Sequence, residues 1–468
     1  MSKKKAFKLP HTFIILTIFI SVISILSYII PAGTYERIIG EDGRAIVDPN
    51  TFQYIKNTPV SLMQFLTAIP QGYVEAGFII ALTLCVGAGV AVVQRIGVIP
   101  AAVEYLATNF KDKGIFVIPI LMLIFSLSDA FIGVCELCII YIPIIMPLML
   151  RLGFDSITAC AVALCGSAAG FSAALTNPFT LAIGQKISGL PLYSGWEFRV
   201  ITYIITLSIG ILYVMNYAKK IQNNPELSTV YEEDKEKRIK LLGNSEEVKT
   251  IKLNKREKIA GIYSIIMLVI MLGGVLIYKW DMPQMCAMFL LIGVGAGVIA
   301  GLNGNELCET LLQGCQDMLM GAVIIGIARG ISVVMSAGNM TDTVVNFFAQ
   351  MLQNIPPSLT AIGMLIVVSL MNFLIPSGSG KAVVLFPILS PLADVVGITR
   401  QTAILAYQFG DGFSNIMYPT SGYFMACISN AGVSWQKWIR FFTPLFIIWT
   451  TVAAGYLVIA QFINYGPF

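Results

Sequence analysis

Charged side chains and histidine are scarce in this sequence. Asp, Glu, Lys and Arg make up 12% of its 468 residues, about half the share found in a soluble domain, while hydrophobic residues make up 56%. The single histidine is His11. One histidine leaves almost no means of building a zinc site or a Ser-His-Asp triad. The composition therefore predicts an all-α, multi-pass integral membrane protein and argues against an enzyme of either class.

The few cations are concentrated in two segments. Of the 30 Lys and Arg residues, four lie at positions 3, 4, 5 and 8, and eleven lie between Lys219 and Lys258. Clusters of this kind flank transmembrane helices on the cytoplasmic side. We therefore expect a cytoplasmic N-terminus and a cytoplasmic linker at 219–258, and we do not read the net charge of +4 as a sign of nucleic-acid binding.

Long apolar runs predict about nine transmembrane helices. A run of this length can cross a hydrocarbon core of about 30 Å at about 1.5 Å per residue. The runs are 12–31, 73–94, 157–188, 198–217, 259–279, 284–301, 315–335, 400–430 and 441–463. Two further apolar regions, 114–150 and 358–395, are interrupted at their middles by polar residues with glycine or proline. Backbone interrupted at membrane depth must be buried in protein or line a wet cavity, so these regions predict two re-entrant hairpins.

The two halves of the chain repeat one another. Gly72 and Gly314 lie 242 positions apart, and the stretch GFSAALTNP at 170–178 recurs as GFSNIMYP at 412–419. Glycine, proline and polar breaks recurring in order predict an internal repeat. The resulting divisions are a first half 1–218 with an extracytoplasmic loop 32–70 and a repeat at 72–217, the linker 219–258, and a second half 259–468 with a repeat at 314–463.

Charge also predicts how the repeats are oriented. The loop 95–113 carries Arg95, Lys111 and Lys113, whereas its counterpart 336–357 carries no Lys or Arg. The positive-inside rule places these loops on opposite sides of the membrane, although Arg400 then falls outside and violates the rule. The repeats are therefore expected to be inverted and the hairpins opposed. Inverted repeats with broken helices are typical of alternating-access transporters whose site lies near the midplane.

Candidate binding residues lie at four breaks, namely the two hairpin tips and the middles of the runs 157–188 and 400–430. Free N–H groups of half-helices can bind an anionic group, while free carbonyls and hydroxyls can hold Na⁺. We expect any Na⁺ site near Asn177 and Asn415, coupling to Na⁺ or H⁺, and no other cofactor. The candidates are Ser128, Asp129, Ser172, Thr176, Asn177, Thr180, Asn372, Ser377, Gly378, Ser379, Lys381, Asp411, Ser414, Asn415, Thr420 and Ser421.

Ionisable residues at membrane depth are functional candidates because an unpaired charge there is costly. The acids are Asp129, Glu136 and Asp411, and the bases are Arg329 and Lys381. The excess of acids favours a cation in the site, which can be a proton, Na⁺ or a substrate amine. Lys381 has two interpretations, as a partner for a substrate carboxylate or as the counter-ion of Asp411.

Five stretches carry a family resemblance that covers essentially the whole chain. They are KLPHTFIIL with IIPAGTYER, LTNPFTLAIGQKISGLPLYSGW, NFLIPSGSGKAVVLFPILSPLADVVGITRQ, and AYQFGDGFSNIMYPTSG. With these motifs the sequence resembles the C4-dicarboxylate anaerobic carrier family, in a branch named for basic amino-acid antiport. The resemblance implies the ion transporter superfamily fold, a homodimer in which each copy has a scaffold domain and a transport domain holding the hairpins and broken helices. It also implies the cytoplasmic (inner) membrane of a prokaryote.

The resemblance also implies where the substrate binds. In that superfamily a Ser-Asn-Thr-type motif at a hairpin tip and its neighbouring broken helix binds carboxylate and Na⁺. The nearest matches here are Thr176-Asn177-Pro178 and Asn372 with Ser377-Gly378-Ser379. Neither tip carries a plain Ser-Asn-Thr string, and Asp129 and Lys381 add charges, so the dicarboxylate and Na⁺ chemistry does not simply carry over.

The sequence thus predicts a secondary active transporter of a small organic carboxylate or amino acid, leaning to basic amino-acid exchange of the arginine/ornithine type. Its partners are a small-molecule substrate, the lipid bilayer and a second copy of the chain. The alternatives are a Na⁺- or H⁺-coupled C4-dicarboxylate carrier, a Na⁺/H⁺ antiporter and, from another class, an intramembrane aspartyl enzyme using Asp129 and Asp411. No P-loop is present, so the energy must come from a gradient.

Overall fold

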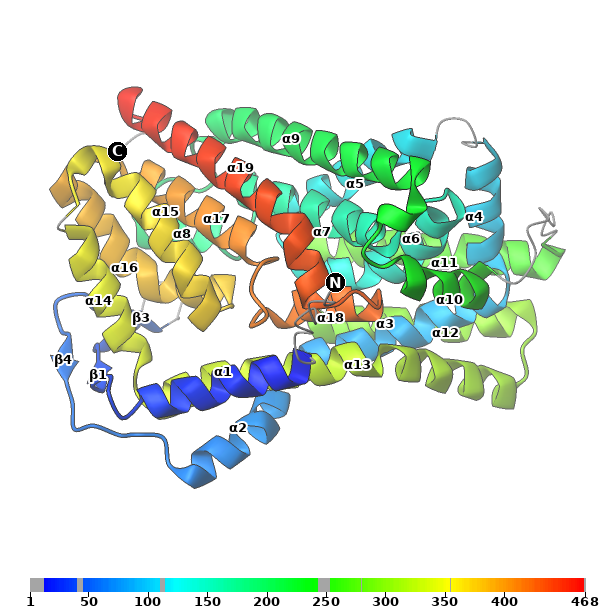
Figure 1. The fold of residues 1–468 in the computed structure, drawn as a ribbon, viewed down its shortest axis with the longest axis horizontal. Coiled ribbons are helices and arrows are strands. Elements are labelled where there is room, and N and C mark those ends of the chain that lie inside the picture. The colour runs from blue at the N-terminus through cyan, green and yellow to red at the C-terminus, as the bar shows by residue number, and fades with distance from the viewer. Residues whose placement is uncertain are drawn as a thin grey trace, which may run out of the picture.

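The computed structural model describes residues 12–39, 45–109, 114–242, 253–278, 280–353 and 355–466. The described chain is built almost entirely of helices, many of which run side by side along the long axis of Figure 1. His11, the N-terminal lysines, Lys111, Lys113 and residues 243–252 of the linker lie outside the described residues.

Nine helices within the described ranges are long and apolar enough to cross a membrane. Nine is the number expected from the apolar runs, but two of these nine helices are not among the expected spans. The expected hairpin arms α5 (Val117–Phe131, preceded by η1, Gly114–Phe116) and α16 (Gly378–Val396) belong to the nine, whereas α1 (Thr12–Leu26) and α17 (Arg400–Ser414) are shorter than 18 residues. The other seven are α3 (Gly77–Arg95), α7 (Ser156–Ala173), α9 (Trp196–Asn223), α11 (Lys255–Tyr278), α12 (Met282–Ala300), α13 (Gly304–Ala337) and α19 (Trp435–Phe462).

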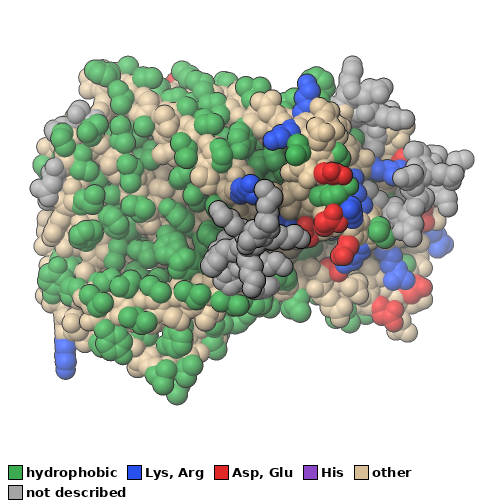
Figure 2. Space-filling model, in the orientation of Figure 1, with side chains coloured by type: hydrophobic (Ala, Val, Ile, Leu, Met, Phe, Trp, Pro, Cys, Tyr) green, Lys and Arg blue, Asp and Glu red, His purple; other side chains and the backbone are tan. Residues whose placement is uncertain are grey.

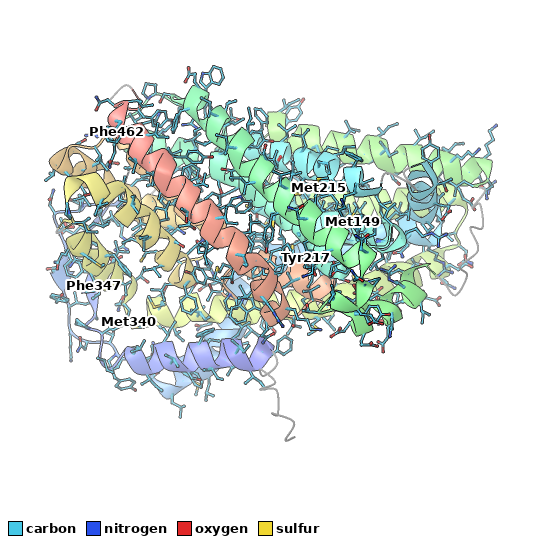
Figure 3. The ribbon with its side chains drawn as sticks, turned by 45° about the horizontal axis from the view of Figure 1, so that its top comes forward. Met149, Met215, Tyr217, Met340, Phe347 and Phe462 are labelled. Carbon is cyan, nitrogen blue, oxygen red and sulfur yellow. The ribbon has the colours of Figure 1, made fainter. Side chains whose placement is uncertain are left out.

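The outer surface fits a multi-pass membrane protein. Apolar side chains cover most of the face in Figure 2, while acidic and basic side chains gather at one end, around α10 (Tyr231–Leu242). Phe347 and Phe462, labelled in Figure 3, are 62% and 84% exposed. Large apolar patches of this kind are unstable in water and are satisfied by lipid.

One group of helices packs around α13. Helix α3 lies along both α13 and α12, and α13 also contacts α1 and α2 (Leu62–Glu75). Gly87 of α3 and Gly314 of α13 permit the closest approach, because a Cβ at Gly87 would lie 2.4 Å from the Gly314 carbonyl oxygen. Small residues of this kind let transmembrane helices pack backbone to backbone. Helix α11 belongs to the same group because it packs on α12.

The predicted loop 32–70 ends earlier than expected. Ser61 and Gln64 form a capping box that starts α2 at Leu62, within that range. The remainder forms two short antiparallel pairs, in which β1 (Gly33–Thr34) pairs with β4 (Gln53–Tyr54) and β2 (Arg37–Ile39) pairs with β3 (Ala45–Val47). The loop is held to α14 (Thr341–Gln353) by a two-pronged ion pair between Arg37 and Asp342, with nitrogen–oxygen distances of 2.6 and 2.8 Å.

The remaining helices form a second group with a crossed arrangement. Helix α5 packs on α7, α15 (Pro357–Leu374) packs on α17, and α7 and α17 pack on each other. The second arm of each interrupted region contacts the broken helix of the other half, since α6 contacts α18 and α16 contacts α8. The shorter elements here are α4 (Val98–Asn109), η2 (Cys135–Leu137), α6 (Cys138–Arg151), α8 (Leu181–Ile187) and α18 (Gly422–Asn430).

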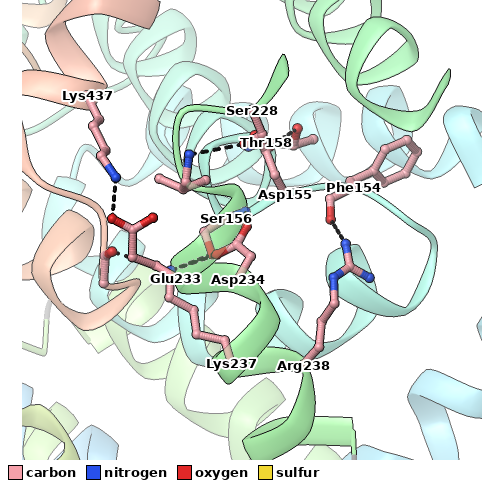
Figure 4. A network of polar contacts seen from close by, with 12 residues as sticks. Phe154, Asp155, Ser156, Thr158, Ser228, Glu233, Asp234, Lys237, Arg238 and Lys437 are labelled. Carbon is pink, nitrogen blue, oxygen red and sulfur yellow. Dashed lines mark hydrogen bonds and ion pairs between the residues drawn. The ribbon is translucent and has the colours of Figure 1, made fainter. Parts of the chain in front are cut away.

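The first part of the charged linker is a helix fixed to this second group. After η3 (Pro225–Leu227), α10 docks against the start of α7, as Figure 4 shows. Asp234 accepts a hydrogen bond from the Ser156 backbone N–H at 2.7 Å, and Arg238 donates to the Phe154 carbonyl oxygen at 2.6 Å. Glu233 pairs with Lys437 at the start of α19. Helix α10 is therefore attached both to the start of α7 and to the start of α19.

Candidate functional site

Each of the four predicted regions contains a non-helical break, but the breaks are shorter than expected. Five residues predicted at the breaks lie inside helices α5, α7, α15 and α17, namely Ser128, Asp129, Ser172, Asn372 and Ser414. The most constrained one follows α7, where Ala174 has a φ of +46°, a left-handed conformation that alanine rarely adopts. The helix resumes seven residues later as α8. The breaks lie between Phe131 and Cys135, Ala173 and Leu181, Leu374 and Gly378, and Ser414 and Gly422.

Two adjoining cavities, of about 290 and about 230 Å³, lie where these breaks meet. Glu136, Ser377, Ser379 and Tyr423 line both, so the two cavities lie side by side. Each approaches the lower end of the range of about 300–1,000 Å³ typical of small-molecule sites. Seven predicted residues line the two cavities: Thr180, Ser377, Gly378, Ser379, Asn415, Thr420 and Ser421.

The smaller cavity combines features of an anion site with one acid, Glu136, which it shares with the larger cavity. The N-termini of α16 and α18 both reach it, and helix N-termini carry free N–H groups and a partial positive charge. The hydroxyls of Thr420 and Ser421 have no hydrogen-bond partner although these residues are only 1% and 2% exposed. Arg329 lines the same cavity and pairs with Glu75 at 2.8 Å. A carboxylate placed here would lie next to both Thr420 and Ser421.

The larger cavity is acidic. Glu136, from the first interrupted region, and Asp281, the N-cap residue of α12, line it, and its lining contains no Lys or Arg among the described residues. Two carboxylates on one small cavity attract a cation and disfavour an anion. The site therefore has one end suited to a carboxylate and another suited to an ammonium or guanidinium group.

Lys381 and Asp411 lie behind the cavity wall, where they pair with each other. The Lys381 Nζ lies 2.7 Å from Asp411 Oδ1, and both side chains are fully buried. Asn372 completes the cluster, because its Oδ1 accepts from Lys381 at 2.6 Å and its Nδ2 donates to Ser414 Oγ at 2.9 Å. A Cβ at Gly378 would lie 2.7 Å from Asp411 Oδ2, so the start of α16 rests directly on this carboxylate. Of the two interpretations of Lys381, the geometry supports the counter-ion.

The amide oxygens of Asn177 and Asn415, the residues near which any Na⁺ site is expected, are already engaged. Asn177 Oδ1 accepts from the backbone N–H groups of Phe179 at 2.8 Å and Thr180 at 3.1 Å, and Asn415 Oδ1 accepts from Asn372 Nδ2 at 3.1 Å. In this conformation the residues present do not fit a Na⁺ ion bound through these two side chains. Within the described ranges there is also no group of three or more His, Cys, Asp or Glu residues placed to hold a metal.

The other predicted residues do not line the cavities. Ser172 donates to the Ala168 carbonyl oxygen at 2.6 Å, and Thr176 donates to the Phe131 carbonyl oxygen at 3.1 Å, so both serve local packing. Ser128 accepts from the Tyr141 hydroxyl at 2.9 Å. Asp129 is fully buried beside Ser167 of α7.

A model of the C4-dicarboxylate anaerobic carrier family matches residues 9–462. The chain belongs to this family. The resemblance predicted from the motifs is thereby confirmed, and with it a membrane transporter rather than an enzyme. Among the relatives of this C4-dicarboxylate carrier family member is an Escherichia coli (strain K12) protein named "Putative basic amino acid antiporter YfcC", which is 29% identical over 98% of this chain and 97% of its own length. An uncharacterized protein of Haemophilus influenzae is 26% identical over 95% of each chain.

Solved structures of transporters also align with this family member. The YdaH transporter of Alcanivorax borkumensis gives a TM-score of 0.42 at 14% identity, covering 98% of this chain and 100% of that one. MtrF of Neisseria gonorrhoeae, described with a class of antimetabolite efflux pumps, gives 0.44 at 18% identity, covering 99% and 98%.

Two acids were not among the predicted binding residues although they line the larger cavity. Glu136 is one of the acids expected at membrane depth, and Asp281 lies between two predicted spans, 259–279 and 284–301. The four residues Asp281-Met282-Pro283-Gln284 carry a helix-start signature, with a capping residue followed by proline and glutamine. That signature predicts the start of α12 but does not predict which cavity the start faces.

Proposed function

We propose that the protein is a secondary active transporter that carries a small amino acid with a cationic side chain across the cytoplasmic membrane by alternating access. The observation that carries the proposal is the two-ended cavity. Its smaller part offers two helix N-termini and two unpartnered hydroxyls to a carboxylate, and its larger part offers Glu136 and Asp281 to a cation. The name of the Escherichia coli relative points the same way.

The alternatives fit the cavity less well. A C4-dicarboxylate, suggested by the name of the family, would place its second carboxylate against Glu136 and Asp281, where like charges repel. A Na⁺/H⁺ antiporter has no need of two adjoining cavities of about 290 and about 230 Å³. An aspartyl enzyme would need a free pair of acids, whereas Asp411 is paired with Lys381.

The positions of the helices support inverted repeats. The ends of α2 and α3, Leu62 and Arg95, lie 242 residues before Gly304 and Ala337, the ends of α13. Helices α4 and α14 follow these segments and lie at opposite ends of the molecule in Figure 1. The crossed contacts of α6 with α18 and of α16 with α8 are those expected of two interlocked copies. Arg400 violates the positive-inside rule in this arrangement, but its charge is paired with Asp394 at 2.6 Å.

Cysteine labelling tests this orientation. In a variant without the native cysteines, Thr108→Cys in α4 should react with a membrane-impermeant maleimide only from the cytoplasmic side, and Gln350→Cys in α14 only from the outside. Both residues are exposed. The control is Glu236→Cys in α10, which should behave like Thr108→Cys. Reaction of Thr108→Cys and Gln350→Cys from the same side would contradict the inverted arrangement.

Counterflow in proteoliposomes tests the substrate. Vesicles loaded with unlabelled arginine should take up labelled arginine, ornithine or lysine, while succinate and neutral amino acids should exchange poorly. Thr420→Ala and Ser421→Ala each remove a hydroxyl positioned for the carboxylate, and a hydrogen bond to a charged group is worth about 1.5–3 kcal/mol. Affinity should therefore fall by about tenfold or more in each variant.

A matched control lies in α18, the helix that follows these two residues. Ser429 of α18 is also an unpartnered buried hydroxyl, but it lines a separate cavity beside α10. Ser429→Ala should leave arginine affinity unchanged. Preferred exchange of succinate over arginine in the wild-type protein would replace the proposed substrate with a dicarboxylate.

A further inference from the structure

Asp129 is a buried acid that the proposed substrate site does not use. It lies near the end of α5, is fully buried, and accepts a hydrogen bond from the Ser167 hydroxyl through Oδ2. Its other oxygen, Oδ1, has no hydrogen-bond partner. A carboxylate left ionised in this setting would lose its hydration without a compensating charge.

In the second half of the protein, the buried acid Asp411 has a counter-ion. Asp411 has Lys381 at 2.7 Å, whereas no Lys or Arg of the described ranges forms an ion pair with Asp129. At repeat offsets of 242 to 244, the positions equivalent to Lys381 are Leu137, Cys138 and Ile139. The sequence of the first copy therefore provides no counter-ion at this place.

The groups that face Asp129 from the neighbouring elements are neutral or acidic. Helix α7 contributes Ser167, and α9 contributes Tyr203, which shares a hydrogen bond with Ser126 one turn before Asp129. The titratable groups of η2 and α6 that interact with it are Cys135, Glu136, Cys138 and Tyr141. No cation is among them, so the charge of an ionised Asp129 would have to be balanced by something that binds.

A proton fits this place better than a metal cation. Na⁺ and similar hard cations need several oxygen ligands, whereas the neighbouring Ser167 hydroxyl donates a hydrogen bond to Asp129. A proton needs a single free oxygen, and Oδ1 provides it. Glu136, which interacts electrostatically with Asp129, lines both substrate cavities and connects this acid to the site.

We propose that Asp129 binds the coupling proton, and that this proton and a cationic substrate beside Glu136 exclude one another. Substrate binding on one side of the membrane releases the proton from Asp129 Oδ1 to water, and protonation on the other side releases the substrate. The cycle is then an exchange of one proton for one substrate cation. This inference rests on the proposed function.

Two transport assays separate the role of Asp129 from substrate binding, with arginine as the probe. In wild-type vesicles, an interior one pH unit more acidic than the exterior should drive about tenfold accumulation of labelled arginine, because one proton is exchanged for one substrate. Asp129→Asn keeps the shape of the side chain but cannot take up or release the proton. It should lose this accumulation and keep arginine counterflow, which needs no net proton movement.

Controls keep the outcome interpretable. Asp394→Asn removes an exposed acid paired with Arg400 and should behave as wild type in both assays. Should Asp129→Asn fail to fold, proton release on adding arginine to the wild-type protein in weakly buffered detergent solution provides a second test, with about one proton expected per bound arginine.

A failure of the proposed function and a failure of the proton site give different results. Absence of wild-type arginine counterflow overturns both the proposed function and this inference. Normal counterflow with accumulation driven by a Na⁺ gradient and not by a pH gradient overturns the proton site alone, and so does pH-driven accumulation that persists in Asp129→Asn.

Discussion

Replacing both members of the buried pair, Asp411→Asn with Lys381→Met, should restore most of the stability that either replacement removes alone. Both side chains are fully buried, and the ammonium nitrogen lies 2.7 Å from the carboxylate. Removing one partner leaves a charge inside the protein without its counter-ion, which typically costs about 3–5 kcal/mol. Removing both partners leaves no unpaired charge inside the protein, so this cost disappears.

The two single variants should differ in severity. In Lys381→Met the Asp411 carboxylate keeps only the Asn415 amide, at 3.3 Å, so this variant should be the less stable one. In Asp411→Asn the ammonium group keeps Asn372 Oδ1 at 2.6 Å. The double variant still leaves Asn372 Oδ1 without its donor, a loss of about 1–3 kcal/mol. Thermal unfolding in detergent should therefore rank the variants as wild type, double variant, Asp411→Asn and Lys381→Met.

Transport by the same variants decides what the pair is for. If Lys381 only neutralises Asp411, the double variant should regain arginine counterflow together with its stability. A double variant that is folded and stable but does not exchange arginine would show that Asp411 acts on the substrate or the coupling ion directly. Asp394→Asn serves as the control for loss of an acid that is paired at the surface.

The sequence predicts the breaks and the apolar segments well because both depend on local patterns. Runs of apolar residues and the interruptions at Ser377-Gly378-Ser379 and Thr176-Asn177-Pro178 can be recognised without knowing the fold. Local patterns do not fix the count of membrane-crossing helices, because α5 and α16, expected as hairpin arms, satisfy the same criterion of length and composition as the seven helices expected to span. Hydropathy alone does not distinguish a hairpin arm from a crossing helix.

The composition of the cavity wall is less predictable, because it depends on contacts between distant segments. Glu136 and Asp281 are far apart in the chain, and nothing local to either indicates that they share a cavity. The same holds for the hydroxyls. Ser172 and Ser421 are both polar residues at a break, yet Ser172 bonds to its own helix while Ser421 remains free. A hydroxyl can always bond to the preceding turn, so only the fold shows which hydroxyl does not.

The contact between α5 and α7 provides the second large effect, through Gly170→Ala. A Cβ at Gly170 would lie 1.9 Å from the Ser126 carbonyl oxygen and 2.7 Å from its carbon. One turn earlier, a Cβ at Gly166 would lie 3.0 Å from the Met122 carbonyl oxygen. The spacing Gly166-x-x-x-Gly170 therefore lets the two helix backbones touch, as small residues four apart do in membrane helices.

Gly170→Ala should destabilise the protein by about 3 kcal/mol, the upper part of the usual range for overpacking, because the obstacle is backbone and cannot rotate away. It should also impair transport, since pushing α5 from α7 separates Asp129 from the Ser167 hydroxyl that donates to it. Gly455→Ala in α19 is the matched control, because nothing lies within 4 Å of its Cβ position. That change should be neutral or stabilising by up to about 1 kcal/mol, as alanine favours helix over glycine. Equal melting temperatures for the two variants would mean that α5 and α7 are farther apart than the contact at Gly170 indicates.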